Sequence, residues 1–353
     1  MSKTDELCST FETRLPIQEA FTQSLSALCR TIIESGGIEI QNIEARTKTV
    51  SSLKEKINRP DKLDKYEELD DVTDLTGIRV ILFLQEDCDK AIKLLGKNLK
   101  VDKANSTDKD FGDDADRFGY ASRHLVVSHT EERCKLKDFK AFKDLKAEIQ
   151  VRTVLQHAWA AIDWRLRYKS ESEVPRQLRR RLYRISALLE SADDEFSTLE
   201  LASVKIRKEY TNKITQSKSD IPIDGDSIKI FLSNDPEWLS IIEELRKHGV
   251  QIHKSVGNNS VRISLAIELL GQAGYSGIND IRSDLKTHRA DIIRIVPNIY
   301  RNVESPVAPT FSPEGILRIS VLLARRQNAE SLLDKTRFAP RLLSSIRGTL
   351  DLN

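Results

Sequence analysis

The sequence lacks the features that mark membrane proteins, disulfide-stabilised proteins and zinc proteins. Its four cysteines, Cys8, Cys29, Cys88 and Cys134, are far apart and form no CxxC pair, which argues against a disulfide framework and a zinc site. No apolar run approaches the roughly 20 residues that span a bilayer, and the N-terminus has no apolar signal core. We therefore expect a cytoplasmic protein with reduced thiols and no membrane partner.

Net charge is also nearly absent, at +2 from 56 basic and 54 acidic residues in a chain of 353. The average hides an uneven distribution, because residues 165–184 (RLRYKSESEVPRQLRRRLYR) are strongly basic. A local basic surface attracts phosphates even on a near-neutral protein. An amphipathic surface helix with its leucines facing inward explains the same segment without any ligand.

Hydrophobic periodicity predicts two domains, at 14–215 and 227–353, joined by a linker at 215–226. The first is expected to be an α+β domain in which helices flank a small mixed β-sheet. The second is expected to be mainly helical, and its role is not readable from the sequence. Predicted helices cover 14–35, 38–58, 87–99, 153–168, 174–210, 236–248, 261–273, 277–295 and 312–326, and predicted strands cover 77–84, 122–129 and 146–153.

Residues 44–60 (EARTKTVSSLKEKINRP) concentrate cations on one predicted helix. Lys48, Ser52 and Lys56 share a helix face, and Arg46 lies near its start. Three cations and a hydroxyl suit a polyphosphate, although a solvated helix face is the commoner outcome for such a segment.

Two acids are expected to meet at the sheet. Asp74 precedes the strand at 77–84, and strand alternation in KAEIQVRT (146–153) directs Glu148, Gln150 and Arg152 into a cleft. Carboxylates on neighbouring strands suit Mg²⁺, which prefers oxygen ligands and retains substrate phosphates. Taken alone, Asp74 fits a turn residue as well.

The segment FGYASRHLVV (118–127) adds a tyrosine that can stack on a base. Ser122 and His124 are expected to point the same way along the strand that follows Tyr120. The alternative without a ligand is that Tyr120 packs on the core and His124 is an ordinary surface histidine.

The motifs occur in a specific order, Arg-x-Lys-x₃-Ser-x₃-Lys, Asp-Leu-Thr-Gly-Ile-Arg, Gly-Tyr-x-Ser-x-His and Glu-Ile-Gln-Val-Arg-Thr. In this order they resemble the RelA/SpoT-like nucleotidyltransferases, the alarmone (ppGpp) synthetase domain, over about residues 40–170. The resemblance implies a GTP diphosphokinase that transfers pyrophosphate from ATP to the 3′-hydroxyl of GDP or GTP.

The resemblance also implies a role for each matching residue. Asp74 and Glu148 would hold Mg²⁺, and Glu148 would act as the base on the acceptor hydroxyl. The ATP-binding residues would be Arg46, Lys48, Ser52, Lys56 and Arg79, and the acceptor-binding residues would be Tyr120, Ser122, His124, Gln150, Arg152 and Lys169.

Two departures from the family pattern stand out. Asp163-Trp164 occupies positions where the family usually has Glu-His, so the acid is kept and the imidazole is lost. The hydrolase half of the long members carries a His-Asp metal motif, and because no histidine is followed by aspartate here we expect no hydrolase activity. Small family members often form tetramers, but the extra helical tail leaves homo-oligomer formation open.

Two other functions stay open on the sequence. A toxic branch of the same family pyrophosphorylates the 3′ end of tRNA, and the basic segment 175–184 suits RNA; the C-terminal domain would then be autoregulatory. An inactive nucleotide-sensing module belongs to a different class, and both carboxylates and the cations argue against it.

Overall fold

The computed structural model describes residues 2–60, 62, 65–106, 123–166, 176–217, 220–253, 260–301, 311–333 and 338–350. The chain divides into two compact units, Met1–Glu200 and Leu201–Asn353. The division falls inside one long helix, α6 (Arg176–Gln216), and each unit has a hydrophobic core of its own. No helix in the described ranges is both long and apolar enough to cross a membrane.

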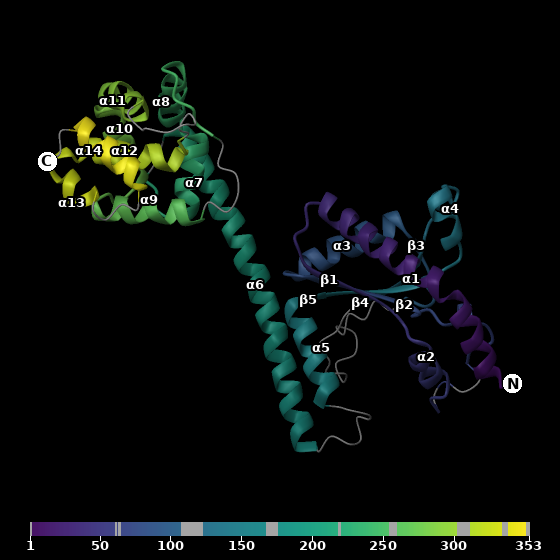
Figure 1. Cartoon of the computed structure of the whole chain (residues 1–353). Helices are drawn as coiled ribbons and strands as arrows, with labels where there is room; N and C mark the ends of the chain where they lie inside the picture. The colour runs from purple at the N-terminus through teal and green to yellow at the C-terminus, as the bar shows by residue number, and fades with distance from the viewer. Residues whose placement is uncertain are drawn as a thin grey trace. The chain divides into compact units, whose positions relative to one another are not determined.

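The first unit is built on a five-stranded sheet in the order β1-β2-β5-β4-β3. β2 and β5 are parallel, and the other neighbouring pairs are antiparallel. Helices flank this mixed sheet (Figure 1), which confirms the predicted α+β class. The longer elements are α1 (Lys3–Ser35), β1 (Ile40–Thr47), α2 (Val50–Ile57), β2 (Thr76–Leu82), α3 (Gln85–Asn98), β3 (Lys100–Val101), β4 (Arg123–Ser128), β5 (Ala147–Thr153) and α5 (Val154–Leu166). Short helical turns lie at Leu69–Asp71, α4 (Glu131–Cys134) and Lys137–Phe142.

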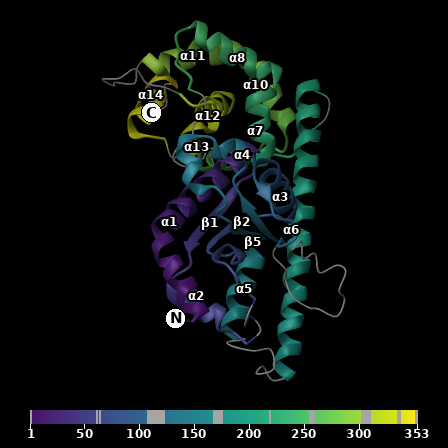
Figure 2. The ribbon, with the colours of Figure 1, turned by 90° about the vertical axis from the view of Figure 1, so that its right-hand side faces the viewer.

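The two faces of the sheet are covered by different helices. α1 and α3 cover one face and α5 lies on the other (Figure 1), while Figure 2 shows β1, β2 and β5 side by side. The apolar residues of β5, Ile149 and Val151, are buried in the core beneath α1 and α3, as the alternation of the strand predicts. The polar residues of the same strand are left for the opposite face.

The predicted helix over 38–58 is wrong in its first half. Residues Ile40–Thr47 form β1, paired with β2, and only Val50–Ile57 are helical. The side-chain hydroxyl of Thr49 accepts a hydrogen bond from Ser52 N and so starts α2 as its N-cap. The helical spacing of Lys48, Ser52 and Lys56 concealed an edge strand that ends at Thr47.

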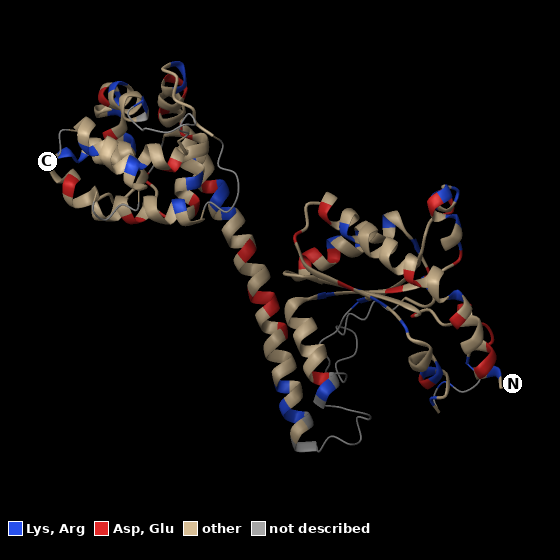
Figure 3. Cartoon of the chain, viewed as in Figure 1, with Lys and Arg blue, Asp and Glu red and all other residues tan. Residues whose placement is uncertain are grey.

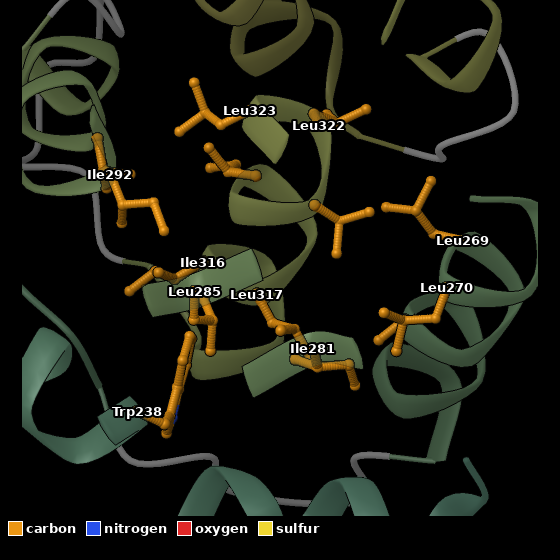
Figure 4. Close-up of a cluster of buried hydrophobic side chains, with 14 of the residues drawn as sticks. Trp238, Leu269, Leu270, Ile281, Leu285, Ile292, Ile316, Leu317, Leu322 and Leu323 are labelled. Carbon is orange, nitrogen blue, oxygen red and sulfur yellow. The ribbon is translucent and has the colours of Figure 1, made fainter. Parts of the chain in front are cut away.

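The second unit is entirely helical in its described part, apart from isolated bridges. α12 lies at the centre of its core, with almost every residue buried, and Figure 4 shows Leu317 and Leu322 among their apolar neighbours. The predicted helix start at Ser312 is confirmed, because its hydroxyl accepts from Gly315 N. The predicted helix over 277–295 is two helices, and α7, α13 and α14 were not predicted. The helices are α7 (Gly225–Asn234), α8 (Pro236–Lys247), α9 (Ser260–Gln272), α10 (Ile278–Thr287), α11 (Arg289–Arg301), α12 (Pro313–Ala324), α13 (Ala329–Leu333) and α14 (Pro340–Leu350), with a short turn at Arg326–Asn328.

A buried histidine lies at the end of the first unit's core. The ring of His129 meets Phe21 and Phe139 edge-on at centroid distances of 5.4 and 5.1 Å. Neither ring nitrogen has a hydrogen-bond partner among the described residues. Burial, helped by the charge of Arg133, lowers the pKa of His129 from 6.5 to about 4, so the folded chain favours the neutral ring.

This histidine predicts acid-sensitive stability. Because the folded pKa is depressed, its contribution is fully present above pH 6.5 and is lost as the pH falls toward about 4. We expect His129→Phe to remove about 2 kcal/mol of the stability loss between pH 8 and pH 5. Urea unfolding of both proteins at the two pH values measures the difference. An identical pH dependence in the variant would show that His129 is not the titrating group.

Candidate active site

The polar face of the sheet carries a grid of charged and amide side chains. Cross-strand register places Glu44 beside Arg79 and Arg46 beside Gly77, and it places Glu148 beside Gly77 and Gln150 beside Arg79. These positions share one face because side chains alternate along each strand. They enclose a cavity of about 150 Å³ lined by Glu44, Ala45, Arg46, Asp74, Gly77, Ile78, Arg79, Glu148 and Gln150.

Gly77 forms part of the floor of this cavity. The side chain of Arg46 lies across it, so a Cβ added at position 77 would be 3.6 Å from Arg46 Cγ and Nε. That distance is ordinary van der Waals contact, so sterics do not demand glycine here. Because glycine has no side chain, the cavity is deeper between Arg46 and Glu148 than it would be with any other residue at position 77.

Asp74 is held by two lysines just before β2 begins. Its Oδ2 lies 3.1 Å from Lys48 Nζ and its Oδ1 lies 2.7 Å from Lys56 Nζ. Burial raises the pKa of Asp74, but the two lysines outweigh burial and leave the pKa below its usual value. Lys48 N also donates to Leu75 O at 2.8 Å, which fixes the end of β1 against the start of β2.

Glu148 belongs to a chain of polar contacts along β5. Glu148 Oε1 accepts from Gln150 Nε2 at 2.6 Å and lies 3.2 Å from His124 Nδ1, while Gln150 Oε1 accepts from Arg152 Nη2. The hydrogen bond from His124 is the largest cause that lowers the pKa of Glu148 to about 2. Glu148 is therefore a carboxylate at neutral pH.

Arg152 reaches the site only through Gln150. It is buried, and burial together with the charge of Arg79 lowers its pKa. An arginine nevertheless stays charged at neutral pH. Its guanidinium fixes the amide of Gln150, which in turn orients Glu148.

Glu44 is a third cavity acid, which the sequence analysis did not identify. Glu44 Oε2 accepts from Arg79 Nη1 at 3.1 Å, and Glu44 Oε1 lies 3.9 Å from His157 Nε2 on α5. The signal is the cross-strand pairing of Glu44 with Arg79, which becomes visible only once residues 40–47 are recognised as a strand.

The predicted site residues divide into four groups. Arg46, Asp74, Arg79, Glu148 and Gln150 line the cavity, and Lys48, Lys56, His124 and Arg152 contact those residues. Ser52 is exposed on the first turn of α2, where it accepts a hydrogen bond from the hydroxyl of Thr49. Tyr120, Ser122 and Lys169 lie outside the described residues.

Helices α5 and α6 are hydrogen-bonded to Thr153, the last residue of β5. Thr153 Oγ1 donates to the buried Asp193 of α6 at 2.6 Å, and Gln156 Oε1 accepts from Thr153 N at 2.9 Å. The end of the strand that carries Glu148 is thereby fastened to both helices.

Asp74 and Glu148 are the carboxylates that could hold the expected Mg²⁺. Asp74 and Glu148 line one cavity, and the pKa of each is lowered, so both offer anionic oxygens. No set of three His, Cys, Asp or Glu side chains in the described ranges is arranged as a metal site. Mg²⁺ is commonly held by one or two carboxylates together with water and substrate phosphates, so this donor pair fits it.

Known proteins are similar in sequence to the part of the chain that holds the cavity. Residues 45–173 match the family model "Region found in RelA / SpoT proteins". The GTP pyrophosphokinase YjbM of Bacillus subtilis is 28% identical over 160 residues, which are 45% of this chain and 72% of the relative. The GTP pyrophosphokinase YwaC of the same organism is 26% identical over 142 residues, 39% of this chain and 63% of that relative, so this chain spans less than two thirds of it.

Some solved structures are similar to part of the chain. The small alarmone synthetase 1 from Bacillus subtilis is 24% identical with a TM-score of 0.46, and the match covers 56% of this chain and 98% of that one. A GTP pyrophosphokinase family protein from Streptococcus pneumoniae is 25% identical with a TM-score of 0.45, covering 54% and 92%. Residues 45–173, which match the RelA / SpoT family model, hold most of the cavity and both of its predicted metal-binding carboxylates, and the two curated relatives that this chain resembles are GTP pyrophosphokinases.

Proposed function

We propose that the protein transfers pyrophosphate from ATP to the 3′-hydroxyl of GDP or GTP and releases AMP. The observation that carries this proposal is the convergence of Asp74 and Glu148 on one cavity that is bordered by Arg46, Lys48, Lys56 and Arg79. The two curated relatives are named GTP pyrophosphokinases, and a related solved structure is described as bound to its product pppGpp.

In this reaction the protein has mainly to position the two nucleotides and to neutralise the charge of the phosphates. The acceptor 3′-oxygen forms a bond to the β-phosphorus of ATP, the bond between that phosphorus and the oxygen leading to AMP breaks, and the acceptor hydroxyl loses its proton. Phosphoryl-type transfer of this kind leaves little covalent work for side chains. A cavity lined by both signs of charge is suited to that task.

The lysines and arginines are assigned to the donor. Lys48 and Lys56 contact Asp74, and a triphosphate would give them a second set of anionic acceptors. Arg46 lies across Gly77 at the cavity floor, where its guanidinium can pair with phosphate oxygens in bidentate fashion. Ser52 and Arg79 complete the donor contacts that the resemblance implies.

Asp74 and Glu148 are assigned to Mg²⁺. The ion, when bound, neutralises phosphate charge and lowers the pKa of the acceptor hydroxyl. Glu148 is held by His124 and Gln150, which fixes its carboxylate toward the cavity and toward the acceptor. His124, Gln150 and Arg152 would bind the acceptor nucleotide, together with Tyr120, Ser122 and Lys169.

An assay with labelled donor tests the proposal. The full chain is incubated with Mg²⁺, ATP labelled in its β- and γ-phosphates, and GDP, GTP or bulk tRNA. Label on a guanine nucleotide supports the proposal. Label on tRNA alone would assign the chain to the toxic branch, and transfer to none of them would indicate a nucleotide-sensing module.

Glu148→Gln is expected to lower transfer at least about 100-fold, because the amide keeps the volume but loses the charge that metal binding and proton removal require. The melting temperature should change little. Glu131→Gln is the matched control, since Glu131 is an exposed acid on α4. Near-full activity of Glu148→Gln would remove Glu148 from its assigned role.

Lys56→Met is expected to raise the KM for ATP by at least roughly tenfold, since a hydrogen bond to a charged group contributes about 1.5–3 kcal/mol. Lys54→Met is a suitable control, because Lys54 lies two residues away on α2 and pairs with Asp5 outside the cavity. Initial rates at varied ATP separate the two variants. Equal KM values would show that Lys56 serves only to hold Asp74.

A further inference from the structure

Glu44 lines the cavity but has no task in the reaction proposed above. Its side chain is 40% exposed, so a ligand in the cavity can reach it. Glu44 Oε2 accepts a hydrogen bond from Arg79 Nη1 at 3.1 Å. Glu44 Oε1 lies 3.9 Å from His157 Nε2, which is beyond hydrogen-bond distance. No donor in the described part of the chain therefore occupies Oε1, and this oxygen is available to a ligand.

Cross-strand register arranges the side chains of the cavity in two rows. The rows are Arg46–Gly77–Glu148 and Glu44–Arg79–Gln150. They share one face of the sheet because they are two residues apart on each strand, a separation of roughly 7 Å. Figure 3 shows acidic and basic residues interspersed along these strands. The row that contains Glu44 is the one farther along β2 from Asp74, and so from the predicted Mg²⁺ site.

Charge determines which part of a nucleotide can lie against Glu44. A carboxylate repels phosphate, and it accepts hydrogen bonds but donates none. Phosphates are attracted instead to Arg46, Lys48 and Lys56. The part of a nucleotide that suits Glu44 Oε1 is therefore an N–H or O–H group of the nucleoside.

The position of Glu44 on β1 indicates which nucleotide it faces. Of the cations assigned to ATP, Arg46 belongs to β1 and Lys56 to the helix that follows it. Glu44 precedes Arg46 by two residues on the same face of β1. The acceptor is assigned to the other side of the cavity, where His124 lies on β4. A donor whose phosphates are bound at Arg46 can therefore extend its nucleoside along β1 to Glu44.

We propose that Glu44 determines the specificity for the donor base, because its Oε1 accepts a hydrogen bond from the 6-amino group of adenine. A 6-oxo purine presents an oxygen at the same position, which a carboxylate repels. Glu44 thus selects ATP as the donor over GTP or ITP. The inference rests on the proposed function, since it takes the phosphates of the donor to lie at Arg46 and Lys56.

Exchanging the donor base tests this role. Transfer to GDP is measured with ATP and with ITP as labelled donors, for the unmodified full chain and for Glu44→Gln. The glutamine keeps an oxygen for Arg79, and its amide NH₂ can donate to a 6-oxo purine. We expect the ratio of kcat/KM for ATP to kcat/KM for ITP to fall at least about tenfold in Glu44→Gln, because a hydrogen bond to a charged group is lost.

Glu39→Gln is the matched control for this experiment. Glu39 is an exposed acid just before β1 and does not line the cavity. The same loss of charge at this position should leave the ratio unchanged.

A role confined to holding Arg79 predicts a different result. Glu44→Ala removes the acceptor for Arg79, and in that case transfer would fall equally with both donors. An unchanged ratio in Glu44→Gln and Glu44→Ala would therefore overturn the proposal. Two other results would also contradict it, because they would place Glu44 elsewhere: a change only in the preference for GDP over IDP as acceptor, or only in the preference for ATP over 2′-deoxy-ATP.

Binding separates this inference from the proposed function. If the unmodified chain transfers from neither donor, the proposed function fails, and calorimetric titration with ATP and with ITP in Mg²⁺ gives the same comparison from dissociation constants. A preference for ATP that Glu44→Gln removes would still support the role of Glu44. Equal affinities of the unmodified chain for the two nucleotides, or binding of neither, would overturn it.

Discussion

The parallel pairing of β2 with β5 is the constraint on which the candidate site depends. Strands that run in the same direction begin at the same edge of a sheet, so Asp74, which leads into β2, and Glu148, near the start of β5, reach one cavity. An antiparallel pairing would separate the starts of two seven-residue strands by roughly 20 Å. Core packing of Ile149 and Val151 fixes the register, since a shift by one residue would turn Glu148 into the core.

Charge balance follows from that register. Asp74 has Lys48 and Lys56 and Glu44 has Arg79, while Glu148 accepts hydrogen bonds from His124 and Gln150. Each pair limits the cost of removing a carboxylate from water, and each carboxylate stays ionised. Under the proposed function, the phosphates of a nucleotide and a divalent cation would offer these side chains equivalent partners.

Much of this arrangement was predictable from the sequence, and the exceptions have physical causes. The alternation of residues 146–153 fixed the faces of β5, so Glu148 and Gln150 were placed correctly in the cavity. β1 was missed because Lys48, Ser52 and Lys56, which follow it, recur at helical spacing, and because an edge strand carries polar residues that weaken the alternation. Glu44 was missed with it, since only the pairing of β1 with β2 brings Glu44 to Arg79. The break between α10 and α11 at His288 was not predicted, because no glycine or proline marks it in the sequence.

The most direct test of the account is a crystal structure with Mg²⁺ and a non-hydrolysable ATP analogue. The account predicts one ion whose ligands are the analogue's phosphates and the carboxylates of Asp74 and Glu148, either directly at about 2.0–2.1 Å or through ordered water. Lys48 and Lys56 would then be turned toward the phosphates. An ion bound by phosphates and water alone, with Asp74 still held by both lysines and Glu148 apart from it, would contradict the account.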